Sequence, residues 1–417
     1  MADAFAHDPP ALARDLAAFF TTGIENDGAA FDALARRVFA HQYARNAPYR
    51  AFCDGRGATP QTIAAWRNIP AAPAAAFKYF ALTCAPEDAC RPENGGRVFF
   101  SSGTTGAETS RHFMDAPALD LYRVSLRAGY RRFVLPDGAR LPVFALMAPP
   151  APQVWGEEKS VSPGPGFTPG PTFARLSSPQ TWGAGGAAAP HSSLSFMLGE
   201  LIADDGGRFF SAPGWQTELA AALRALTAPV VIFGTAFAFV HFFDAVTETF
   251  ALPAGSRVVE TGGFKGRSRE VSRDELYALF TERLGVPATH CLSEYGMSEM
   301  ASQFYDSTLV DYVRGVVRPP RKIGPFWLRT RVVDPVTGTD AAPGEPGLLA
   351  HYDLANLNSV FAIQTEDYGH AAPDGDGFVL LGRAPGAVLR GCSLLAEEMA
   401  ATGTSQENPA RPPNRTP

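Results

Sequence analysis

Apolar residues near the start of the chain recur three and four positions apart, which is the spacing of one face of an α-helix. The segments ALARDLAAFF and FDALARRVFAHQYARN, within residues 11–50, both have this pattern. Asn26, Asp27 and Gly28 separate the two segments and predict a connecting loop. We therefore expect two helices joined by a short turn in this region.

Short apolar runs alternate with helical patterns over much of the remaining chain. Strands are predicted at residues 98–100 and 139–150, and a buried strand running into a helix at 229–243. The segments SRVVETGGF and RDELYALFTERLGVP repeat the order strand, loop, helix. This alternation predicts an α/β sheet with helical crossovers. The run 229–243 is too short for a membrane span, so no integral membrane segment is expected.

One long segment fits neither period. The chain has 40 glycines and 36 prolines, and the excess gathers at residues 149–190. Proline lacks the backbone donor that ladders and helices need, and glycine weakens both structures. An ordered lid over a site and a partly disordered insert both fit this segment.

Composition narrows the classes of protein. The chain has 417 residues, of which 46% are hydrophobic and 11% aromatic, as in folded proteins of two to three domains. Its net charge is −6 and no strongly basic block occurs, which argues against nucleic acid as a partner.

The start of the chain and its thiols predict a cytoplasmic location. MADAFAHDPP has no basic segment followed by an apolar one, as a secretory signal would have. The five cysteines fit no zinc spacing and are expected to be free thiols. They are Cys53, Cys84, Cys90, Cys291 and Cys392.

The first segment that could carry chemistry is SSGTTG, directly after the strand at 98–100. It consists of Ser101, Ser102, Gly103, Thr104, Thr105 and Gly106. Small residues let backbone amides approach an anion, and four hydroxyls offer donors to phosphate oxygens. It is not a P-loop, because Ala107 stands where that motif has lysine. A plain turn is the alternative.

A second segment, SEYGMSE at 293–299, follows an apolar stretch. Its carboxylates, among them Glu299, could hold magnesium, and Tyr295, next to Gly296, offers a flat face for stacking. The alternative is a helix N-terminus that Ser298 and Glu299 cap and charge.

A third segment, TGGFKGR, follows the strand-like run at 258–260. Gly262 and Gly263 permit close backbone approach, and Lys265 and Arg267 could neutralise phosphate. A glycine-rich surface turn with solvated cations is the alternative.

The fourth pattern is Thr365-Glu366-Asp367, with Arg383 further on. An aspartate can accept hydrogen bonds from both ribose hydroxyls, with an arginine assisting. Alone, neither the Thr365-Glu366-Asp367 motif nor Arg383 indicates a function. Their order along the chain, after the other three segments, does.

This order of motifs resembles the adenylate-forming superfamily of acyl- and aryl-CoA ligases. The segments IPAAPAAAFKYFAL, HSSLSFM and LRGCSLLAEE are similar to those of one branch, the acyl-protein synthetases. That branch supplies the ligase of the fatty-acid reductase system of bacterial bioluminescence. The resemblance spans about residues 69–398.

The resemblance implies a fold and roles for the residues. The fold would be the large amino-terminal α/β domain. Its ligands would be ATP, Mg²⁺ and a carboxylic acid, which the resemblance implies to be a fatty acid. Residues 101–106 would grip the ATP phosphates, and Tyr295 would lie against adenine with Gly262 and Gly263 opposite. Glu299 would ligate Mg²⁺, Asp367 and Arg383 would hold the ribose, and Cys392 would accept the acyl group.

Two departures from the superfamily's pattern stand out. Glu366 replaces the usual glycine, and Ala384-Pro385 replace the acidic hinge. The carboxy-terminal domain with its catalytic lysine is expected to be truncated or absent. Lys265 or Arg267, or else Lys322, would then meet the negative charge that builds at the α-phosphate.

The expected organisation has four parts. These are a helical lead (1–95), an adenylate-forming core (96–383), a stub with Cys392 (384–400) and a disordered tail (401–417).

Three functions stay open, two of them enzymatic and one non-catalytic. One is an acyl-protein synthetase that acylates Cys392 and hands the acyl group to a partner such as an acyl reductase. Another is a CoA ligase or adenylating enzyme that loads CoA or a carrier-protein thiol. For Cys392 itself, the alternative to an acyl-accepting thiol is a buried or incidental one. The third is a non-catalytic scaffold that kept the fold.

Overall fold

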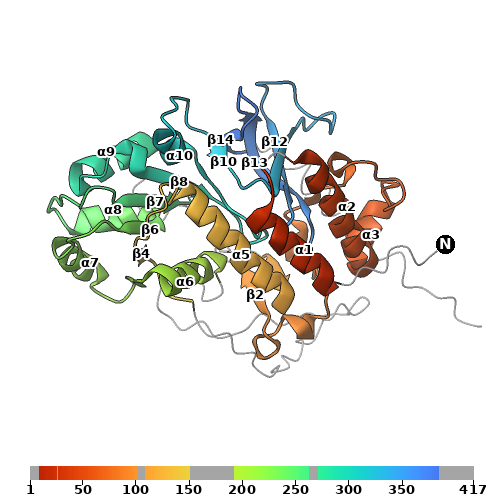
Figure 1. Cartoon of the computed structure of the whole chain (residues 1–417), viewed down its shortest axis with the longest axis horizontal. Coiled ribbons are helices and arrows are strands. Elements are labelled where there is room, and N and C mark those ends of the chain that lie inside the picture. Colours follow the sequence, from red (N-terminus) through yellow and green to blue (C-terminus); the bar gives the residue numbers. More distant parts are fainter. Residues whose placement is uncertain (1–8, 26, 102–108, 151–191, 263–270, 385–417) are drawn as a thin grey trace, which may run out of the picture.

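The computed structural model describes residues 9–25, 27–101, 109–150, 192–262 and 271–384 (Figure 1). Its α-helices are α1 Pro9–Thr22, α2 Gly28–Arg45, α3 Ala47–Asp54, α4 Ala76–Tyr79, α5 Ala116–Phe133, α6 Ser193–Asp205, α7 Trp215–Arg224, α8 Ala236–Ala245, α9 Arg273–Leu284 and α10 Thr308–Val313. Short 3₁₀ helices are η1 Trp66–Asn68, η2 Glu87–Cys90, η3 Pro92–Asn94 and η4 Ala288–His290.

The strands make one large sheet and one hairpin. Their bounds are β1 Ala72–Pro73, β2 Arg97–Phe100, β3 Arg111–Met114, β4 Val143–Leu146, β5 Gly207–Phe209, β6 Val231–Thr235, β7 Arg257–Thr261, β8 Cys291–Tyr295, β9 Phe304–Asp306, β10 Lys322–Ile323, β11 Leu328–Val333, β12 Gly347–Asp353, β13 Ala362–Ala371 and β14 Phe378–Arg383. The large sheet has the order β11-β12-β13-β14-β10-β9-β8-β7-β6-β4-β5, with β1 paired to β13. Strands β2 and β3 form the separate antiparallel hairpin.

The large sheet has a parallel and an antiparallel half. Strands β4 to β8 pair in parallel, as strands joined by helical crossovers do. Pairing becomes antiparallel between β8 and β9 and stays so through β10 and β14 to β11. Strand β8 therefore lies where the two halves meet, and its carboxyl end is the edge at which ligands of α/β sheets bind.

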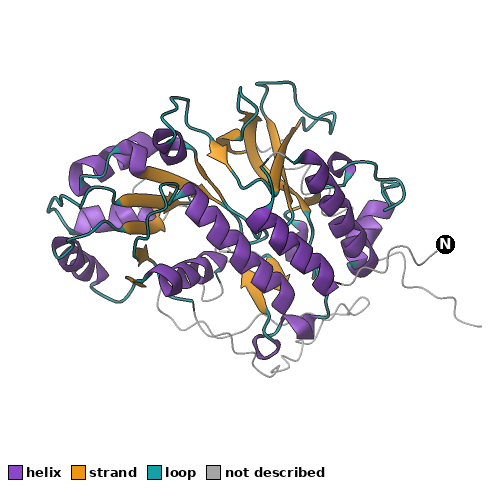
Figure 2. Cartoon of the chain, viewed as in Figure 1, coloured by secondary structure: helices purple, strands orange, loops and turns teal. Residues whose placement is uncertain are grey.

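Helices cover both faces of the parallel half, as Figure 2 shows for the layers of helix and strand. Val259 and Leu292 belong to the core cluster that includes α5 and α6, whereas Val258 and Cys291 pack with α8 and α9. Successive strand residues point to opposite faces, which explains this division. We call the side that packs against α5 and α6 the α5 face, and the side that packs against α8 and α9 the α9 face.

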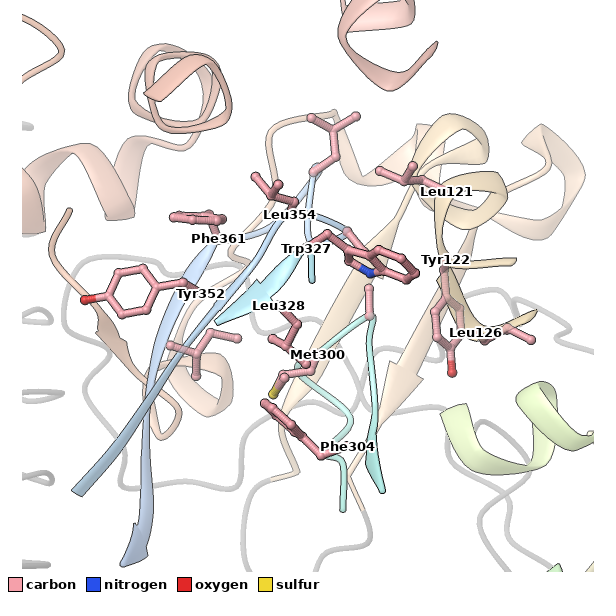
Figure 3. Packing of buried hydrophobic residues seen from close by; sticks show 14 of the residues in the cluster. Leu121, Tyr122, Leu126, Met300, Phe304, Trp327, Leu328, Tyr352, Leu354 and Phe361 are labelled. Carbon is pink, nitrogen blue, oxygen red and sulfur yellow. The ribbon is translucent and has the colours of Figure 1, made fainter. Parts of the chain in front are cut away.

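The main core also includes the amino-terminal helices. Figure 3 shows Trp327 between side chains from α5 and from the antiparallel half, and its indole Nε1 donates to Ser125 Oγ at 3.1 Å. Gln42 on α2 donates to the carbonyl of Asn356 at 2.6 Å and accepts from the amide of Phe361 at 2.8 Å. Helix α2 is thus bound directly to the antiparallel half.

Most of the elements predicted from the sequence are confirmed. Helices α1 to α3 occupy residues 9–54, and the run 229–243 is strand β6 followed by helix α8. The predicted α/β class is confirmed as well. In the part of the chain that the structure describes, no helix is long and apolar enough to cross a membrane. Two predicted regions lie outside the described residues. They are the Gly/Pro-rich segment 149–190 from residue 151 on, and the stub and tail that follow residue 384.

Candidate active site

The segment SSGTTG begins in the loop of the β2–β3 hairpin. The amide of Ser101 donates to the carbonyl of Ser110 at 3.1 Å, and the amide of Ser110 donates to Ser101 Oγ at 3.0 Å. These bonds close the base of the loop one residue pair beyond the ladder. Of the predicted phosphate-binding residues, Ser102, Gly103, Thr104, Thr105 and Gly106 lie outside the described residues.

The segment after β8 packs on this hairpin. Residues 296–300 are not helical, so the helix N-terminus considered from the sequence is wrong. Ser298 Oγ donates to the carbonyl of Phe100 at 3.4 Å, and His112 Nδ1 donates to the carbonyl of Ser298 at 2.8 Å. Burial lowers the pKa of His112 to about 4, so the ring is neutral and acts as a structural donor.

Glu299 is buried against the same hairpin, with 6% of its surface exposed. Burial raises the pKa of its carboxyl, while a hydrogen bond with Ser110 and the charges of Lys78 and Arg383 oppose that shift. The carboxyl that was predicted to hold Mg²⁺ thus lies at the base of the predicted phosphate loop.

Sequence reasoning missed Lys78. It lies on α4, which follows β1, and its neighbour Phe77 packs against the ring of His112 with centroids 5.9 Å apart. The pairing of β1 with β13 brings this short helix to the site. The segment AFKYF contributed only to the resemblance to the acyl-protein synthetases. Its lysine stands at no sequence spacing that would distinguish it from an ordinary surface lysine.

Tyr295, at the end of β8, is bonded to the TED motif. Its hydroxyl donates to Asp367 Oδ2 at 2.7 Å, and Arg383 Nε lies 3.4 Å from Asp367 Oδ1. Asp367 and Arg383 are directly paired across β13 and β14. Glu366, which departs from the superfamily's glycine, forms an ion pair with Arg383 at 3.0 Å.

A buried histidine sets the orientation of the Tyr295 hydroxyl. His351 Nε2 lies 3.3 Å from that hydroxyl and Nδ1 lies 2.9 Å from Thr330 Oγ1. Burial lowers the pKa of His351 to about 3, so the ring is neutral. Because the tyrosine donates to Asp367, its oxygen accepts from His351, and Thr330 donates to the other ring nitrogen.

The TGG motif reaches the same place from β7. Thr261 is paired with Glu294 on β8, and its hydroxyl donates to Glu294 Oε2. Gly262 follows with a φ of +71°, a left-handed conformation that glycine adopts readily, and turns the chain away from the strand. Gly263, Lys265 and Arg267 lie outside the described residues.

Lys322, the alternative cation, lies on the α9 face. Its Nζ donates to the carbonyl of Ser293 at 2.8 Å and forms an ion pair with Asp306 Oδ1 at 3.1 Å. Arg273 of α9 also pairs with Asp306. The Lys322 ammonium is thus buried and bonded within the sheet, at the start of the SEYGMSE segment.

The four described cysteines are free, as expected. Burial raises the thiol pKa of Cys53, Cys90 and Cys291 to about 12, and raises that of Cys84 as well. None of these four is a ready nucleophile, because the reactive form of cysteine is the thiolate. Cys392 lies outside the described residues.

Comparisons by sequence give no assignment. No profile of a known protein family matches this chain. A comparison with curated proteins gives no match either.

The fold is similar to that of 2-hydroxyisobutyryl-CoA ligase. In the postadenylation state with 2-HIB-AMP, the TM-score is 0.55 at 12% identity, over 85% of this chain and 67% of the ligase. An open conformation with 2-HIB-AMP and CoA gives a TM-score of 0.53 at 12% identity, over 86% and 71%. This chain therefore shares the large α/β fold of that CoA ligase.

Proposed function

We propose that this chain uses ATP to activate a carboxylic acid as an acyl-adenylate and then passes the acyl group to a thiol. One observation carries this proposal: the end of β8 contacts all three other motifs. Glu294 is bonded to Thr261, Tyr295 to Asp367, and Ser298 to the β2–β3 hairpin. Four motifs that lie far apart in the sequence thus meet at the carboxyl edge of the sheet.

Each motif then has a part in binding ATP. Residues 101–106 would hold the phosphates through backbone amides and hydroxyls. Tyr295 would lie against adenine beside Gly262 and Gly263, and Asp367 with Arg383 would bind the ribose hydroxyls.

The site fits Mg²⁺ as it is bound in nucleotide enzymes. Mg²⁺ takes one or two carboxylates together with substrate phosphates and water, and Glu299 supplies a buried carboxyl beside the phosphate loop. In the part of the chain that the structure describes, no three acidic, histidine or cysteine side chains gather as a metal site. Bound Mg²⁺ would offset negative charge on the phosphates.

The reaction has two steps. A carboxylate oxygen attacks the α-phosphorus, the bond to the β-phosphate bridging oxygen breaks, and pyrophosphate leaves. A thiolate then attacks the carbonyl carbon of the acyl-adenylate, and AMP leaves with the bonding electrons. Lys265 and Arg267, next to the TGG turn in sequence, are the proposed cations for the first step.

Cys392 is the proposed thiol, with a fatty acid as substrate and an acyl reductase as the receiving partner. Arg390 lies two residues earlier, and a nearby cation lowers a thiol pKa. The raised pKa values of the four described cysteines leave them poor candidates for this step.

Mass spectrometry tests the role of Cys392. Incubation with ATP, Mg²⁺ and a fatty acid should add one acyl group to the wild type and none to Cys392→Ala. Cys53→Ala, which removes a buried thiol, should be labelled like the wild type. Equal labelling of wild type and Cys392→Ala would contradict a Cys392 thioester.

The similarity of the fold to that of a CoA ligase favours a second function. Under this second function, CoA is the alternative acyl acceptor. Under this alternative, Cys392→Ala would form acyl-CoA as fast as the wild type when CoA is supplied.

A further inference from the structure

Glu294 is a buried carboxylate between two of the turns that meet at the site. It has 6% of its surface exposed and is paired with Thr261 across β7 and β8. Paired residues share a face of the sheet, so both side chains lie on the α5 face. The hydroxyl of Thr261 donates to Glu294 Oε2, and both residues lie at strand ends. Gly262 follows Thr261 after β7, and Tyr295, the last residue of β8, leads into Gly296, where the chain leaves the strand.

The other oxygen of Glu294 lies beneath the β8 turn. A Cβ placed on Gly296 would stand 2.5 Å from Glu294 Oε1, well inside the contact distance of carbon and oxygen. Glu294 cannot yield easily, because moving its carboxylate would break the bond to Thr261 inside the protein. The absence of a side chain at Gly296 therefore lets one carboxylate contact both turns.

We propose that Glu294 is a positioning residue that fixes the Thr261-Gly262 turn against the Tyr295-Gly296 turn and so sets the width of the adenine-binding gap. This role rests on the proposed adenylation, in which adenine lies between these two turns. Glu294 itself would contact neither ATP nor the acid. Its effect would pass through the Thr261 hydroxyl and the backbone of Gly296.

The surroundings of Glu294 make this contact specific. On the α5 face its neighbours include Tyr305 and Tyr122, whereas Lys322 lies on the opposite face and influences it through the sheet. Burial raises the pKa of Glu294 to about 7, and the bond from Thr261 opposes that rise. A buried carboxylate with one close donor is costly to misplace, which holds the two turns in one arrangement.

Glu260 provides a matched control. It has the same 6% exposure, lies one residue before Thr261, and has a pKa raised to about 7 by burial. Its pairing with Ser293 puts it on the α9 face, where its carboxyl bonds Ser293 and not Thr261. A variant of Glu260 therefore alters an equally buried carboxyl without altering the adenine gap.

The first experiment measures ATP affinity by calorimetry together with the melting temperature. Thr261→Val removes the donor at nearly constant volume and should weaken ATP binding about tenfold, the size of one buried hydrogen bond. Thr261→Ser keeps the hydroxyl and should bind as the wild type does. Glu260→Gln should change the melting temperature but not the ATP affinity.

The second experiment tests the contact with Gly296. Gly296→Ala should weaken ATP binding, because the new methyl group collides with Glu294 Oε1. Combining it with Glu294→Ala removes the collision, so the double variant should bind ATP no worse than Glu294→Ala alone. Such non-additivity is the sign of two residues in direct contact.

The outcomes separate this role from the proposed function. If wild-type protein binds no ATP, the proposed function fails. If the wild type binds ATP and Thr261→Val binds it equally well, the positioning role is overturned while the function stands. Additive losses in the Gly296→Ala and Glu294→Ala variants would overturn the role as well.

Discussion

Two buried glutamates on neighbouring strands face different surroundings. Glu294 meets one hydroxyl donor on the α5 face. Glu260, on the α9 face, shares its surroundings with Lys322, Asp306 and Arg273, and it also bonds Ser293. Burial raises the pKa of both glutamates to about 7, and the charge of Glu260 adds to the rise at Glu294.

Stability should therefore fall as the pH rises. The pKa of Glu260 is about 7 in the folded protein and 4.5 ordinarily, so its contribution is complete below about 4.5 and lost as the pH passes 7. Each unit of pKa shift corresponds to about 1.4 kcal/mol. Glu260→Gln, which cannot ionise, should lose less stability than the wild type between pH 5 and 8.

Urea unfolding at several pH values measures this difference. The wild type and Glu260→Gln should differ most at the alkaline end, with the variant favoured there. Parallel curves for the two proteins over the whole range would contradict the raised pKa of Glu260. Ser192→Ala, at the N-cap of α6, serves as a control that lowers stability equally at each pH.

At the scale of elements, the Tyr295 hydroxyl joins strand β8 of the parallel half to strand β13 of the antiparallel half. Tyr295→Phe keeps the ring, which packs against Phe304 and Phe378, and removes that link together with the hydrogen bond from His351. The free energy of unfolding should fall by about 1.5–3 kcal/mol, as for a hydrogen bond to a charged group.

Tyr305 is the matched control for this variant. Its hydroxyl is buried on β9 with no hydrogen-bond partner in the described part of the chain. Tyr305→Phe should therefore leave the free energy of unfolding unchanged or slightly raise it, since an unpaired buried hydroxyl is unfavourable. Chemical denaturation of both variants gives the comparison. An equal loss in the two would mean that the Tyr295 bond contributes nothing.

How far the elements could be predicted depended on their local pattern. Strands β6 and β7 and helix α9 follow from apolar runs and helical spacing within the segments themselves. Strand β12 escaped prediction because all seven of its residues are buried and no alternation of apolar and polar residues marks it. Its burial depends on partners β11 and β13, which only the folded sheet supplies.

The candidate site, too, could be predicted only in part. The motifs were predicted one by one, because each has a local composition that suits a phosphate, a ribose or a flat ring. The bonds that join them were not, since Thr261 meets Glu294 through the register of β7 and β8, 33 residues apart. Lys78 was missed because its neighbours in sequence reveal no role for it. Glu294 was considered only as one of the carboxylates that could hold magnesium, and its bond to Thr261 was not foreseen.

At the scale of the whole molecule, the chain combines the fold of a CoA ligase with a site that four distant motifs build at one sheet edge. The comparison spans 85% of this chain and 67% of the ligase. The fold alone does not set the reaction, since one fold hosts many functions. What bears on the reaction is the convergence of Tyr295, Asp367 and Glu299 beside the β2–β3 hairpin.

Exchange of labelled pyrophosphate into ATP, measured over a panel of short, hydroxylated and long-chain acids, tests adenylation most directly. Wild-type protein should catalyse exchange only when its acid is present, and Glu299→Gln should lower the rate about 100-fold, as for loss of a group that stabilises charge in the transition state. Glu260→Gln should retain exchange. Absence of exchange in the wild type with every acid, while the protein is folded, would contradict the account.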